Sequence, residues 1–341
     1  MKIAIEAQRI FRKEKHGMDY VALETIRELQ KIDQQNEYFI LVSPGDDVCL
    51  QESANMHIVT VNWPSYPLWE QIGLPLALKK IKPDLLHCTS NTAPVYGNIP
   101  LVLTLHDIIF LEKNKARTSP CTKDWDVSTE KSLFPKSLPN AKESLPFLIF
   151  ECNRISHFLH IDKQLLVAVY NGYSQHFIPI RNAQAITARY IKNHPYLFFL
   201  GNTDPKKNTA RVLQAYGIYL KKSSQPLPLL IADLKEEIID EYLNREGLQE
   251  IKKMLYHPGY IPNTELPAVY SGASVFIYTS LRESFGIPHS GGDGLWNSRH
   301  HLNHFRHARN RRTGGYSGQS VRTGGNCFRP PSFRRKCRIP K

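Results

Sequence analysis

Two neighbouring lysines, Lys206 and Lys207, stand in a polar loop that begins with Gly201 and Asn202. The loop follows the apolar run 196–200, which has the pattern of a buried strand, and precedes a segment with helical spacing. Two adjacent ammonium groups can form charge-assisted contacts with the two phosphates of a nucleoside diphosphate. The alternative is an ordinary polar turn with solvated lysines, and the residues by themselves leave both interpretations open.

A second polar loop follows the apolar run 274–278, which also has the pattern of a buried strand. Glu283 can accept hydrogen bonds from two sugar hydroxyl groups at once, or it can be a carboxylate favoured at a helix start. Gly286 lets the backbone approach a ligand closely, and Pro288 suits the first turn of a helix whose N–H groups face a phosphate. The candidate ligand-binding residues of this loop are Arg282, Glu283, Ser284, Phe285 and Gly286.

Further polar positions stand next to predicted strands and helices. His106 and Asp107 end an apolar run, so the pair is expected to point into a cleft, although such a histidine is more often structural than catalytic. Gly17 closes a basic loop ahead of a helical segment, and the lysines of that loop can equally be solvated surface groups. Asn91 and Thr92 follow another short apolar run and are candidates for contact with a substrate.

Strand and helix patterns alternate along most of the chain, which predicts parallel sheets with right-handed crossovers. In such sheets the carboxyl ends of the strands meet at one edge, where ligands bind. The pattern therefore predicts an α/β protein of two units, residues 1–177 and 196–288, joined by a hinge at 178–195. Between residues 118 and 150 the periodicity is lost, so no regular element is expected there.

Composition and cysteine usage limit the class of protein. The chain has 341 residues, of which 41% are hydrophobic, and this is enough for two cores. No apolar run reaches the roughly 18 residues of a membrane span, and the charged start of the chain does not have the pattern of a signal peptide. The six cysteines show no CxxC pair and no spacing typical of metal ligands, so reduced thiols in a cytoplasmic protein are expected.

The net charge of +13 is concentrated at the end of the chain. Residues 289–341 carry twelve Lys or Arg and one acid, together with five of the fourteen histidines. This segment is rich in Gly, Arg, Asn and His and lacks periodicity, so we expect a disordered or poorly packed tail. A functional alternative is a basic arm that binds RNA or an anionic surface through residues 309–312 and 334–338.

Residues 269–288 resemble the nucleotide-sugar site of retaining glycosyltransferases of family 4, the group 1 family, whose pattern is E-x-F-G-x-x-x-x-E. Glu283 matches the first glutamate of the pattern, whereas Gly291 stands where the second one is expected. The loop 201–208 resembles the family's phosphate loop, G-x-x-x-x-[RK]-K-N, with Asn202 where many relatives have a basic residue.

The resemblance extends into the first half of the chain. His106 and Asp107 match the H-D pair of the family, in which the histidine lies near the transferred sugar. The segment 69–91 is similar to bacterial members, in which it is mostly scaffold. Together, the resembling parts cover roughly residues 1–112 and 151–288.

The fold and reaction that this resemblance implies are those of a GT-B enzyme. Two Rossmann-like domains would face each other across a cleft, the N-terminal one taking the acceptor and the C-terminal one a nucleotide-diphospho-sugar. The implied reaction is the transfer of a hexose, with mannose as our best prediction, with retention and without a metal or other cofactor. The acceptor would be a glycan or lipid-linked glycan in cell-surface polysaccharide or lipopolysaccharide synthesis. We expect a cytoplasmic enzyme with peripheral contact at the inner membrane face and no nucleic-acid partner.

The resemblance also assigns roles to individual residues. It implies that His106 and Glu283 are catalytic, with Glu283 orienting the donor sugar. The position of Asn91 and Thr92 at a strand end makes them the candidates for acceptor binding. The residues that the resemblance assigns to donor binding are Gly17, Gly201, Asn202, Lys206, Lys207, Arg282, Ser284, Phe285 and Gly286.

The resemblance breaks at two places, after Pro288 and between about 118 and 150. Back-translation of residues 292–301 in a frame shifted by one base permits E-A-M-A-C-G-T-P-V-I, which is how the family continues. The same shift permits R-I-I-T-V-S-D-F at residues 142–150. We therefore interpret 118–150 and 289–341 as out-of-frame translation, a hypothesis that resequencing of the DNA tests. On this interpretation the chain as written is unstable and inactive.

Three other functional classes stay open from the sequence. The chain can be a non-catalytic remnant of a transferase. It can be a basic RNA-binding protein on a transferase scaffold, which RNA binding by full-length and tail-deleted chains at rising salt distinguishes. It can also be a different GT-B enzyme, such as an epimerase, which a screen of nucleotide-sugars distinguishes.

Overall fold

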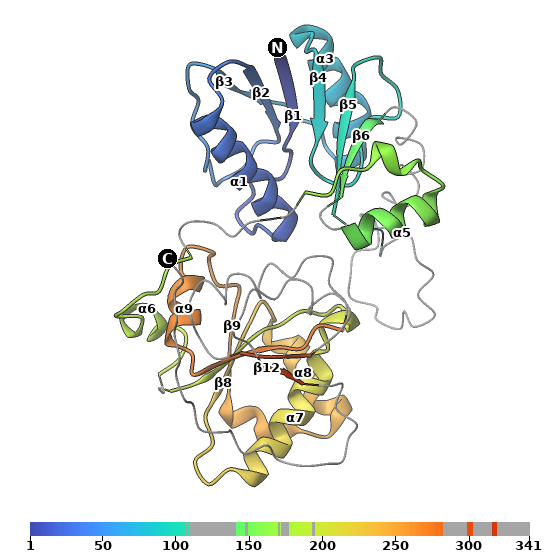
Figure 1. Cartoon of the computed structure of the whole chain (residues 1–341). Helices are drawn as coiled ribbons and strands as arrows, with labels where there is room; N and C mark the ends of the chain where they lie inside the picture. The colour runs from blue at the N-terminus through green and yellow to red at the C-terminus, as the bar shows by residue number, and fades with distance from the viewer. Residues whose placement is uncertain are drawn as a thin grey trace, which may run out of the picture.

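The computed structural model contains two α/β units, one above the other in Figure 1. The residues that the structure describes are 1–106, 108, 141–146, 149–169, 171, 177–192, 195–281, 299–302 and 316–318. Each unit contains a six-stranded sheet, and all neighbouring strands in both sheets run parallel. The predicted α/β class, with two units built on parallel sheets, is therefore confirmed.

The N-terminal unit has the strand order β3-β2-β1-β4-β5-β6. Its strands are β1 (Lys2–Glu6), β2 (Glu37–Val42), β3 (Met56–Thr60), β4 (Leu85–Cys88), β5 (Leu101–Leu105) and β6 (Ala141–Pro146). Its helices are α1 (Gly17–Ile32), α2 (Tyr66–Leu68), the π-helical turn η1 (Trp69–Gly73), α3 (Leu74–Ile81), α5 (Ile149–Leu159) and the 3-10 turn η4 (Lys163–Leu165). The strand order changes direction between β1 and β4, so the loops after these two strands leave toward opposite faces of the sheet.

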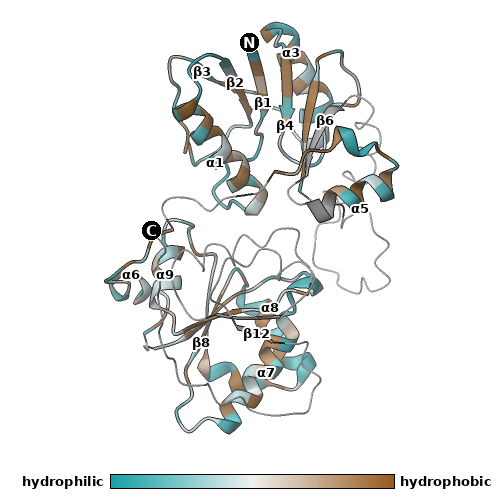
Figure 2. Ribbon diagram, in the orientation of Figure 1, coloured by the Kyte–Doolittle hydropathy of each residue, from teal (hydrophilic) through white to brown (hydrophobic). Residues whose placement is uncertain are grey.

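Successive residues of β1 pack into two separate cores, one on each face of this sheet. Ile5 packs with Leu23 and Ile26 of α1, whereas Ala4 packs with Trp69 of η1. Side chains of a strand alternate between faces, so helices cover both faces of a parallel sheet. Figure 2 shows the corresponding pattern, with brown strands between helices that carry teal on their outer sides. Burial of each large apolar side chain stabilises the unit by roughly 1.5–3 kcal/mol.

The C-terminal unit has the strand order β12-β11-β10-β7-β8-β9. Its strands are β7 (Leu197–Leu200), β8 (Leu229–Ala232), β9 (Leu255–Gly259), β10 (Val275–Tyr278), β11 (Arg299–Leu302) and β12 (Tyr316–Gly318). Its helices are α6 (Gln184–Thr187), the 3-10 turn η5 (Pro205–Lys207), α7 (Thr209–Lys222), α8 (Glu236–Glu246), the 3-10 turn η6 (Gln249–Met254) and α9 (Leu266–Gly272). Here the strand order changes direction between β7 and β10.

Three aromatic rings fix α9 against the centre of this second sheet. The ring of Tyr270, on α9, lies 5.1 Å from the ring of Phe198 on β7 and 4.7 Å from that of Phe276 on β10. All three side chains are fully buried. Edge-to-face contacts of this kind stabilise beyond the buried area itself. They hold β10 in place, and thereby the point where the chain leaves this strand.

The segment expected to lack regular structure contains one strand. β6 lies within residues 118–150 and pairs with β5 in parallel. Strand pairing is made by backbone groups, so it needs no periodic pattern of side chains at an edge position. The tail 289–341 contains β11 and β12. Its other residues lie outside the described part of the chain, so the expectation of disorder stays a prediction.

The segment expected to be a hinge is packed against the C-terminal unit. Within 178–192, Ala183, Thr187 and Ile191 are buried. The backbone N–H of Ile180 donates a 3.0 Å hydrogen bond to the hydroxyl of Ser271 on α9. These contacts make the described part of this segment an ordered layer on α9. In the described part of the chain, no helix combines the length and apolar character needed to cross a membrane.

Candidate active site

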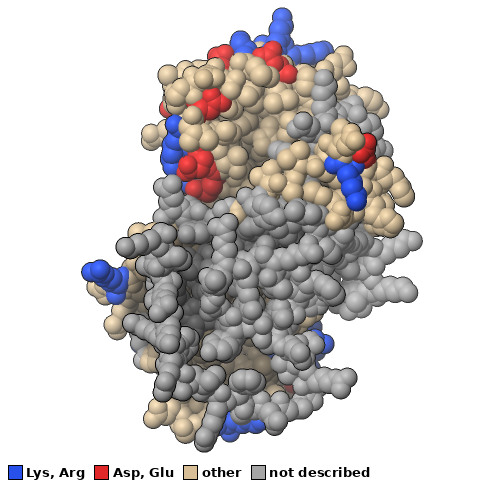
Figure 3. All heavy atoms as spheres, viewed as in Figure 1, with Lys and Arg blue, Asp and Glu red and all other residues tan. Residues whose placement is uncertain are grey.

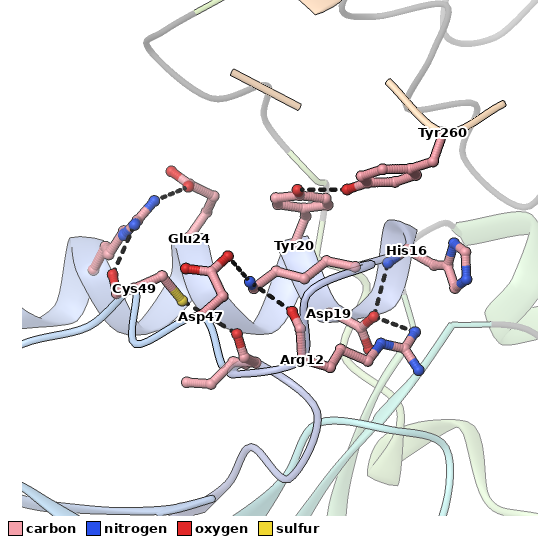
Figure 4. A network of polar contacts seen from close by, with 11 residues as sticks. Arg12, His16, Asp19, Tyr20, Glu24, Asp47, Cys49 and Tyr260 are labelled. Atoms are coloured by element: carbon pink, nitrogen blue, oxygen red, sulfur yellow. Dashed lines mark hydrogen bonds and ion pairs between the residues drawn. The ribbon is translucent and has the colours of Figure 1, made fainter. Parts of the chain in front are cut away.

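The carboxyl ends of the two sheets face each other, and a contact between two tyrosine hydroxyl groups joins them. The hydroxyl of Tyr20 on α1 lies 3.5 Å from the hydroxyl of Tyr260, which directly follows β9 (Figure 4). Burial raises the pKa of Asp233, which directly follows β8, to about 6, and the charge of Glu14 in the loop before α1 adds to this shift. Ligands of α/β proteins bind outside the carboxyl ends of the strands, so this is the candidate site.

The loop 201–208 runs from β7 into α7 at this edge. A Cβ added at Gly201 would lie 2.6 Å from the side chain of Leu234 and 2.9 Å from the carbonyl oxygen of Ala232, so only glycine fits there. The carboxylate of Asp204, the N-cap of the turn η5, accepts a 2.9 Å hydrogen bond from the backbone N–H of Lys206. Asn208 has a left-handed backbone (φ 67°) and starts α7. The loop therefore has a fixed shape that brings both lysines to the carboxyl edge.

The two lysines of this loop are half-buried. The ammonium of Lys206 lies 3.3 Å from the carboxylate of Asp204. Asn202 is exposed at the start of the loop, and its carbonyl oxygen accepts a 2.6 Å hydrogen bond from the hydroxyl of Thr209. Two cations beside the N-terminus of the 14-residue helix α7 suit an anionic ligand.

This loop is bonded to the segment that leaves β10. The backbone N–H of Leu281 donates a 2.7 Å hydrogen bond to the carbonyl of Lys206. The side-chain amide of Asn208 donates to the carbonyl of Thr279 at 3.4 Å. Leu281 is the last described residue before Arg282 and Glu283 in the sequence. The loop with Lys206 is therefore fixed at the point where the chain continues to the predicted sugar-binding residues.

The structure adds Thr279, a residue that the sequence analysis did not single out. Its hydroxyl oxygen is buried, and no hydrogen-bond partner for it exists among the described residues. Buried polar groups in proteins almost always have a partner, so an orphaned hydroxyl needs an explanation. Its position beside the loop 201–208 suits a ligand oxygen as that partner. The only signal in the sequence was a threonine directly after a predicted strand.

Several predicted site residues lie outside the described residues. They are Asp107, Arg282, Glu283, Ser284, Phe285 and Gly286. Their roles stay predictions.

His106 is held by two contacts at the carboxyl edge of the N-terminal sheet. Its backbone N–H donates a 2.8 Å hydrogen bond to the side-chain oxygen of Asn91. Its ring Nε2 lies 2.8 Å from the carbonyl oxygen of Thr89. A carbonyl oxygen can only accept, so Nε2 carries the hydrogen, and in the neutral ring Nδ1 is the acceptor. Asn91 has a left-handed backbone (φ 59°), which asparagine tolerates better than most residues.

The predicted acceptor residues Asn91 and Thr92 are both buried. The hydroxyl of Thr92 lies 2.5 Å from the carboxylate of Glu70 and 2.8 Å from the hydroxyl of Tyr66. Glu70 also accepts hydrogen bonds from Tyr66 at 2.9 Å and from the side chain of Gln71 at 2.7 Å. In the structure, Thr92 belongs to a buried hydrogen-bond network, and Asn91 positions His106.

Glu70 is a second residue that the sequence analysis did not single out. It is fully buried, and burial raises its pKa to about 7. The nearby charge of Glu6, at the end of β1, also raises this pKa. Burial likewise raises the pKa of Glu6, against hydrogen bonds from Gln8 and Thr89 and the charge of Arg9. A pair of buried carboxyl groups therefore underlies this edge of the sheet.

The basic loop before α1 is held mainly by ion pairs within the N-terminal unit (Figure 4). The guanidinium of Arg12 pairs with Asp19. The ammonium of Lys15 is buried and lies 2.5 Å from the carboxylate of Asp47. Gly17 is exposed at the first position of α1, and a Cβ added there would have no atom within 4 Å. The loop is thus a built element at the edge that faces the C-terminal unit, and its paired cations have structural roles.

The described residues contain no group of three or more His, Cys, Asp or Glu that could hold a metal ion.

Comparison with families and curated proteins finds similarity to glycosyltransferases. Residues 184–290 match the family model described as "Glycosyl transferases group 1". The O-antigen chain mannosyltransferase B of Escherichia coli is 28% identical over 192 residues, which cover 55% of this chain and 49% of that protein. The serotype-specific mannosyltransferase WbdA of Escherichia coli is 21% identical over 239 residues, 64% of this chain and 28% of that protein. The chain thus spans about half or less of the length of these relatives.

Comparison with solved structures shows the same two-domain fold, GT-B, at low identity. The sucrose-phosphate synthase of Thermosynechococcus elongatus has a TM-score of 0.67 at 13% identity, over 89% of this chain and 81% of that one. WaaG, a glycosyltransferase involved in lipopolysaccharide biosynthesis, has a TM-score of 0.67 at 10% identity, over 90% of this chain and 82% of that one. HepE of Anabaena, solved in complex with UDP, has a TM-score of 0.63 at 15% identity, over 94% and 86%.

Proposed function

Since residues 184–290 match the family model of the group 1 glycosyl transferases, we propose that the chain moves a hexose from a nucleotide-diphospho-sugar to a glycan or lipid-linked acceptor. One observation carries the proposal more than any other. The loop with Lys206 and Lys207 is bonded through Leu281 to the start of the segment that contains Glu283. Two lysines that suit two phosphates are thereby bonded to the point from which the chain continues, in sequence, to a glutamate whose carboxylate can accept hydrogen bonds from sugar hydroxyls.

The C-terminal unit supplies the groups that stabilise the leaving diphosphate. Breaking the bond between sugar and phosphate leaves negative charge on the diphosphate, and fixed positive charge there lowers the barrier. Lys206 and Lys207 provide this charge, together with the free N–H groups at the start of α7. We further propose that no metal ion takes part, since the two ammonium groups fill the role that a divalent cation fills elsewhere.

The N-terminal unit holds the acceptor side. His106 is oriented by Asn91 and Thr89 at the carboxyl edge of the N-terminal sheet, and we propose that its ring lies near the transferred sugar. Gly17 and the loop before it cover the same edge. We propose mannose as the transferred sugar, supported by the names of the similar Escherichia coli proteins. We propose the assembly of an O-antigen-like or lipopolysaccharide glycan on the cytoplasmic side of the membrane as the biological role.

The proposal is tested with the full-length chain by thermal shift and calorimetry against a panel of nucleotide-sugars. We expect one nucleotide-diphospho-sugar to stabilise the chain, and the double substitution Lys206→Ala, Lys207→Ala to abolish the stabilisation. Lys221→Ala, at an exposed ion pair near the other end of α7, is the matched control and should change nothing. If no nucleotide-sugar binds, or if the double variant binds as well as the wild type, the proposed donor site is wrong.

The alternative function, RNA binding by the basic tail, is tested by measuring RNA binding with the same protein preparation. On the face shown in Figure 3, the described Lys and Arg side chains lie apart from one another or beside Asp and Glu. Salt-sensitive RNA binding without nucleotide-sugar binding would favour that alternative.

A further inference from the structure

We propose that Glu70 is a positioning residue of the candidate active site. It closes a ring of hydrogen bonds with Tyr66 and Thr92, and this ring fixes the loop that holds His106. The inference rests on the proposed function, and it names a group that acts on the reaction through His106 rather than by contact with the substrate.

Three side-chain oxygen atoms lie within hydrogen-bond distance of one another beside this loop. The hydroxyl of Thr92 lies 2.5 Å from the carboxyl oxygen Oε1 of Glu70 and 2.8 Å from the hydroxyl of Tyr66. The hydroxyl of Tyr66 lies 2.9 Å from the same Oε1. The two hydroxyl groups bring only two hydrogens to these three contacts. A hydrogen on the carboxyl group supplies the third, so that each oxygen of the ring donates once and accepts once.

The surroundings of Glu70 favour the protonated carboxyl group that this ring requires. Burial raises its pKa to about 7, and the charge of Glu6 on β1 adds to the shift, whereas hydrogen bonds to the carboxyl group lower it. Burial also raises the pKa of the neighbouring thiol of Cys88 on β4 and of the hydroxyl of Tyr66 on α2. The positive charge of Arg9 acts on Glu6 and Tyr66. At pH 6 Glu70 is therefore mostly protonated, and at pH 8 it is mostly ionised.

The loop after β4 is held at both of its ends. At the first end, the hydroxyl of Thr89 donates a 2.8 Å hydrogen bond to the carbonyl oxygen of Glu6. At the other end, the ring holds Thr92. Between them, the backbone N–H of Thr92 donates to the carbonyl oxygen of Ser90 at 2.6 Å, and Asn91 has a left-handed backbone (φ 59°). A tight turn between two fixed threonines gives Asn91 a defined position.

Asn91 passes this constraint on to His106. Its side-chain oxygen accepts a 2.8 Å hydrogen bond from the backbone N–H of His106. The carbonyl oxygen of Thr89 lies 2.8 Å from the ring Nε2 of His106. Both of these contacts come from the loop that the ring of hydrogen bonds fixes. Opening of the ring should therefore let the loop, and His106 with it, take up other positions.

Small substitutions open the ring and leave the chain folded. Thr92→Val removes one hydroxyl with little change of shape, and Thr92→Ser keeps the hydroxyl as the conservative variant. The segment after the loop has its own anchor, because the side chain of Gln71 accepts from the N–H of Val95 at 2.9 Å and donates to the carbonyl of Ala93 at 3.2 Å. Thr187→Val is the matched control, since Thr187 is a buried threonine on α6, in the other unit.

The first measurement is the exchange of the backbone amide hydrogen of His106, by NMR on the full-length chain labelled with nitrogen-15 at histidine. The chain has fourteen histidines, and the signal of His106 is the one that His106→Gln removes. We expect Thr92→Val to speed this exchange about 2- to 12-fold at pH 6, the effect of one lost hydrogen bond. Thr92→Ser and Thr187→Val should leave it unchanged. The amide of His57, on β3, reports any loss of stability of the whole N-terminal unit.

The dependence of this exchange on pH tests the proton of Glu70. In the wild type, the exchange rate of the His106 amide, divided by its rate in an unfolded chain, should be about 2- to 12-fold higher at pH 8 than at pH 6. The reason is that ionised Glu70 leaves one of the three contacts of the ring without a hydrogen. In Glu70→Gln, which does not ionise, the ratio should be equal at both pH values. A pH dependence that survives in Glu70→Gln overturns the role of this proton.

The second measurement is the rate at which the full-length chain releases GDP from GDP-mannose, which links the ring to the reaction. We expect Thr92→Val to lower kcat about 2- to 12-fold with an unchanged KM for the donor, and Thr92→Ser to keep the wild-type kcat. In the background of Asn91→Gly, where the amide of His106 has lost its acceptor, Thr92→Val should have no further effect. An equal loss in both backgrounds would show that Thr92 does not act through Asn91.

The two measurements separate failure of the inference from failure of the proposed function. If Thr92→Val leaves the exchange at His106 as in the wild type, the positioning role is wrong, while donor binding that depends on Lys206 and Lys207 leaves the proposed function standing. If neither GDP-mannose nor any other nucleotide-sugar of the panel is bound or consumed, the proposed function is wrong, and the role of Glu70 in the reaction with it.

Discussion

The backbone N–H of Leu281 donates a 2.7 Å hydrogen bond to the carbonyl oxygen of Lys206, although the two residues are far apart in sequence. Lys206 lies in the loop between β7 and α7, and Leu281 lies just after β10. Because β7 and β10 are neighbours in the sheet, this single bond joins the starts of two candidate ligand-binding loops. The relationship fixes the loop with Lys206 against the end of β10.

The lysine loop should contribute to donor affinity through charge. We expect Lys206→Ala and Lys207→Ala each to weaken nucleotide-diphospho-sugar binding by about tenfold, the effect of one charge-assisted hydrogen bond. Calorimetry at low and high salt measures the affinities. The difference in affinity between the wild type and the variants should shrink at high salt, since screening weakens the interactions of exposed charges. Equal affinities of wild type and variants at low salt would contradict this role.

Removal of the buried hydroxyl of Thr279 should lower donor affinity without lowering the stability of the protein. Thr279→Val removes a polar atom that has no partner among the described residues, so we expect unchanged or higher stability, by up to about 1 kcal/mol. Donor affinity should nevertheless fall, because the hydroxyl is expected to donate to a ligand oxygen. Thermal unfolding and calorimetry measure the two effects.

Thr209→Val serves as the contrasting control for Thr279. The hydroxyl of Thr209 already donates to the carbonyl of Asn202 at 2.6 Å, so this variant should lose stability. A Thr279→Val variant that is destabilised to the same extent would show that the hydroxyl of Thr279 is engaged within the protein.

Asn91 should act on the reaction through His106. Asn91→Asp keeps the oxygen that accepts from the backbone N–H of His106, and we expect most of the activity to survive. Asn91→Ala loses this acceptor and places a Cβ in a left-handed backbone, which costs about 1–3 kcal/mol. Asn91→Gly loses only the acceptor.

Transfer rates and melting temperatures of the three Asn91 variants separate its two roles. We expect Asn91→Gly to lower kcat with little change in stability or in the KM for the donor. If Asn91→Gly is as active as the wild type, the contact to His106 has no role in the reaction.

Glu70 should make stability depend on pH. Burial raises the folded-state pKa of this carboxyl group from an ordinary value near 4.5 to about 7. Between these values the folded state holds a proton that the unfolded state has lost, so stability falls as pH rises from about 4.5 to about 7. The shift corresponds to roughly 3 kcal/mol.

Glu70→Gln should remove most of this slope, because the amide does not ionise. It should also lower stability at pH 5 by about 1 kcal/mol, since its amino group would face the amino group of Gln71. Urea unfolding at a series of pH values measures both effects. Glu28→Gln, at an exposed position on α1, is the control and should keep the slope. If the stability of Glu70→Gln depends on pH as that of the wild type does, the group that titrates between pH 4.5 and 7 is not Glu70.

Much of the fold follows from patterns that are local in the sequence. The apolar runs at β1, β4, β5, β7 and β10 and the helical spacing of α1 and α7 predict parallel α/β units, because burial on both faces requires apolar residues throughout a strand. The group 1 resemblance was visible in the same way, in short motifs at strand ends. β6 was missed, because pairing by backbone groups at an edge leaves little trace in the side chains.

The sequence indicated only part of the candidate site as well. The sequence identified Lys206, Lys207 and His106, because charged and polar residues directly after apolar runs stand out. It could not show that Thr92 is fully enclosed by Glu70 and Tyr66.

What the sequence determined by itself is therefore which residues stand at strand ends, since this depends on the local order of apolar and polar side chains. What only the tertiary structure decided is which strand ends are neighbours. Strand order places Gly201 beside Asp233, and the packing of two units places Tyr20 beside Tyr260. Contacts between residues distant in sequence depend on the whole set of packed elements, so no local pattern encodes them.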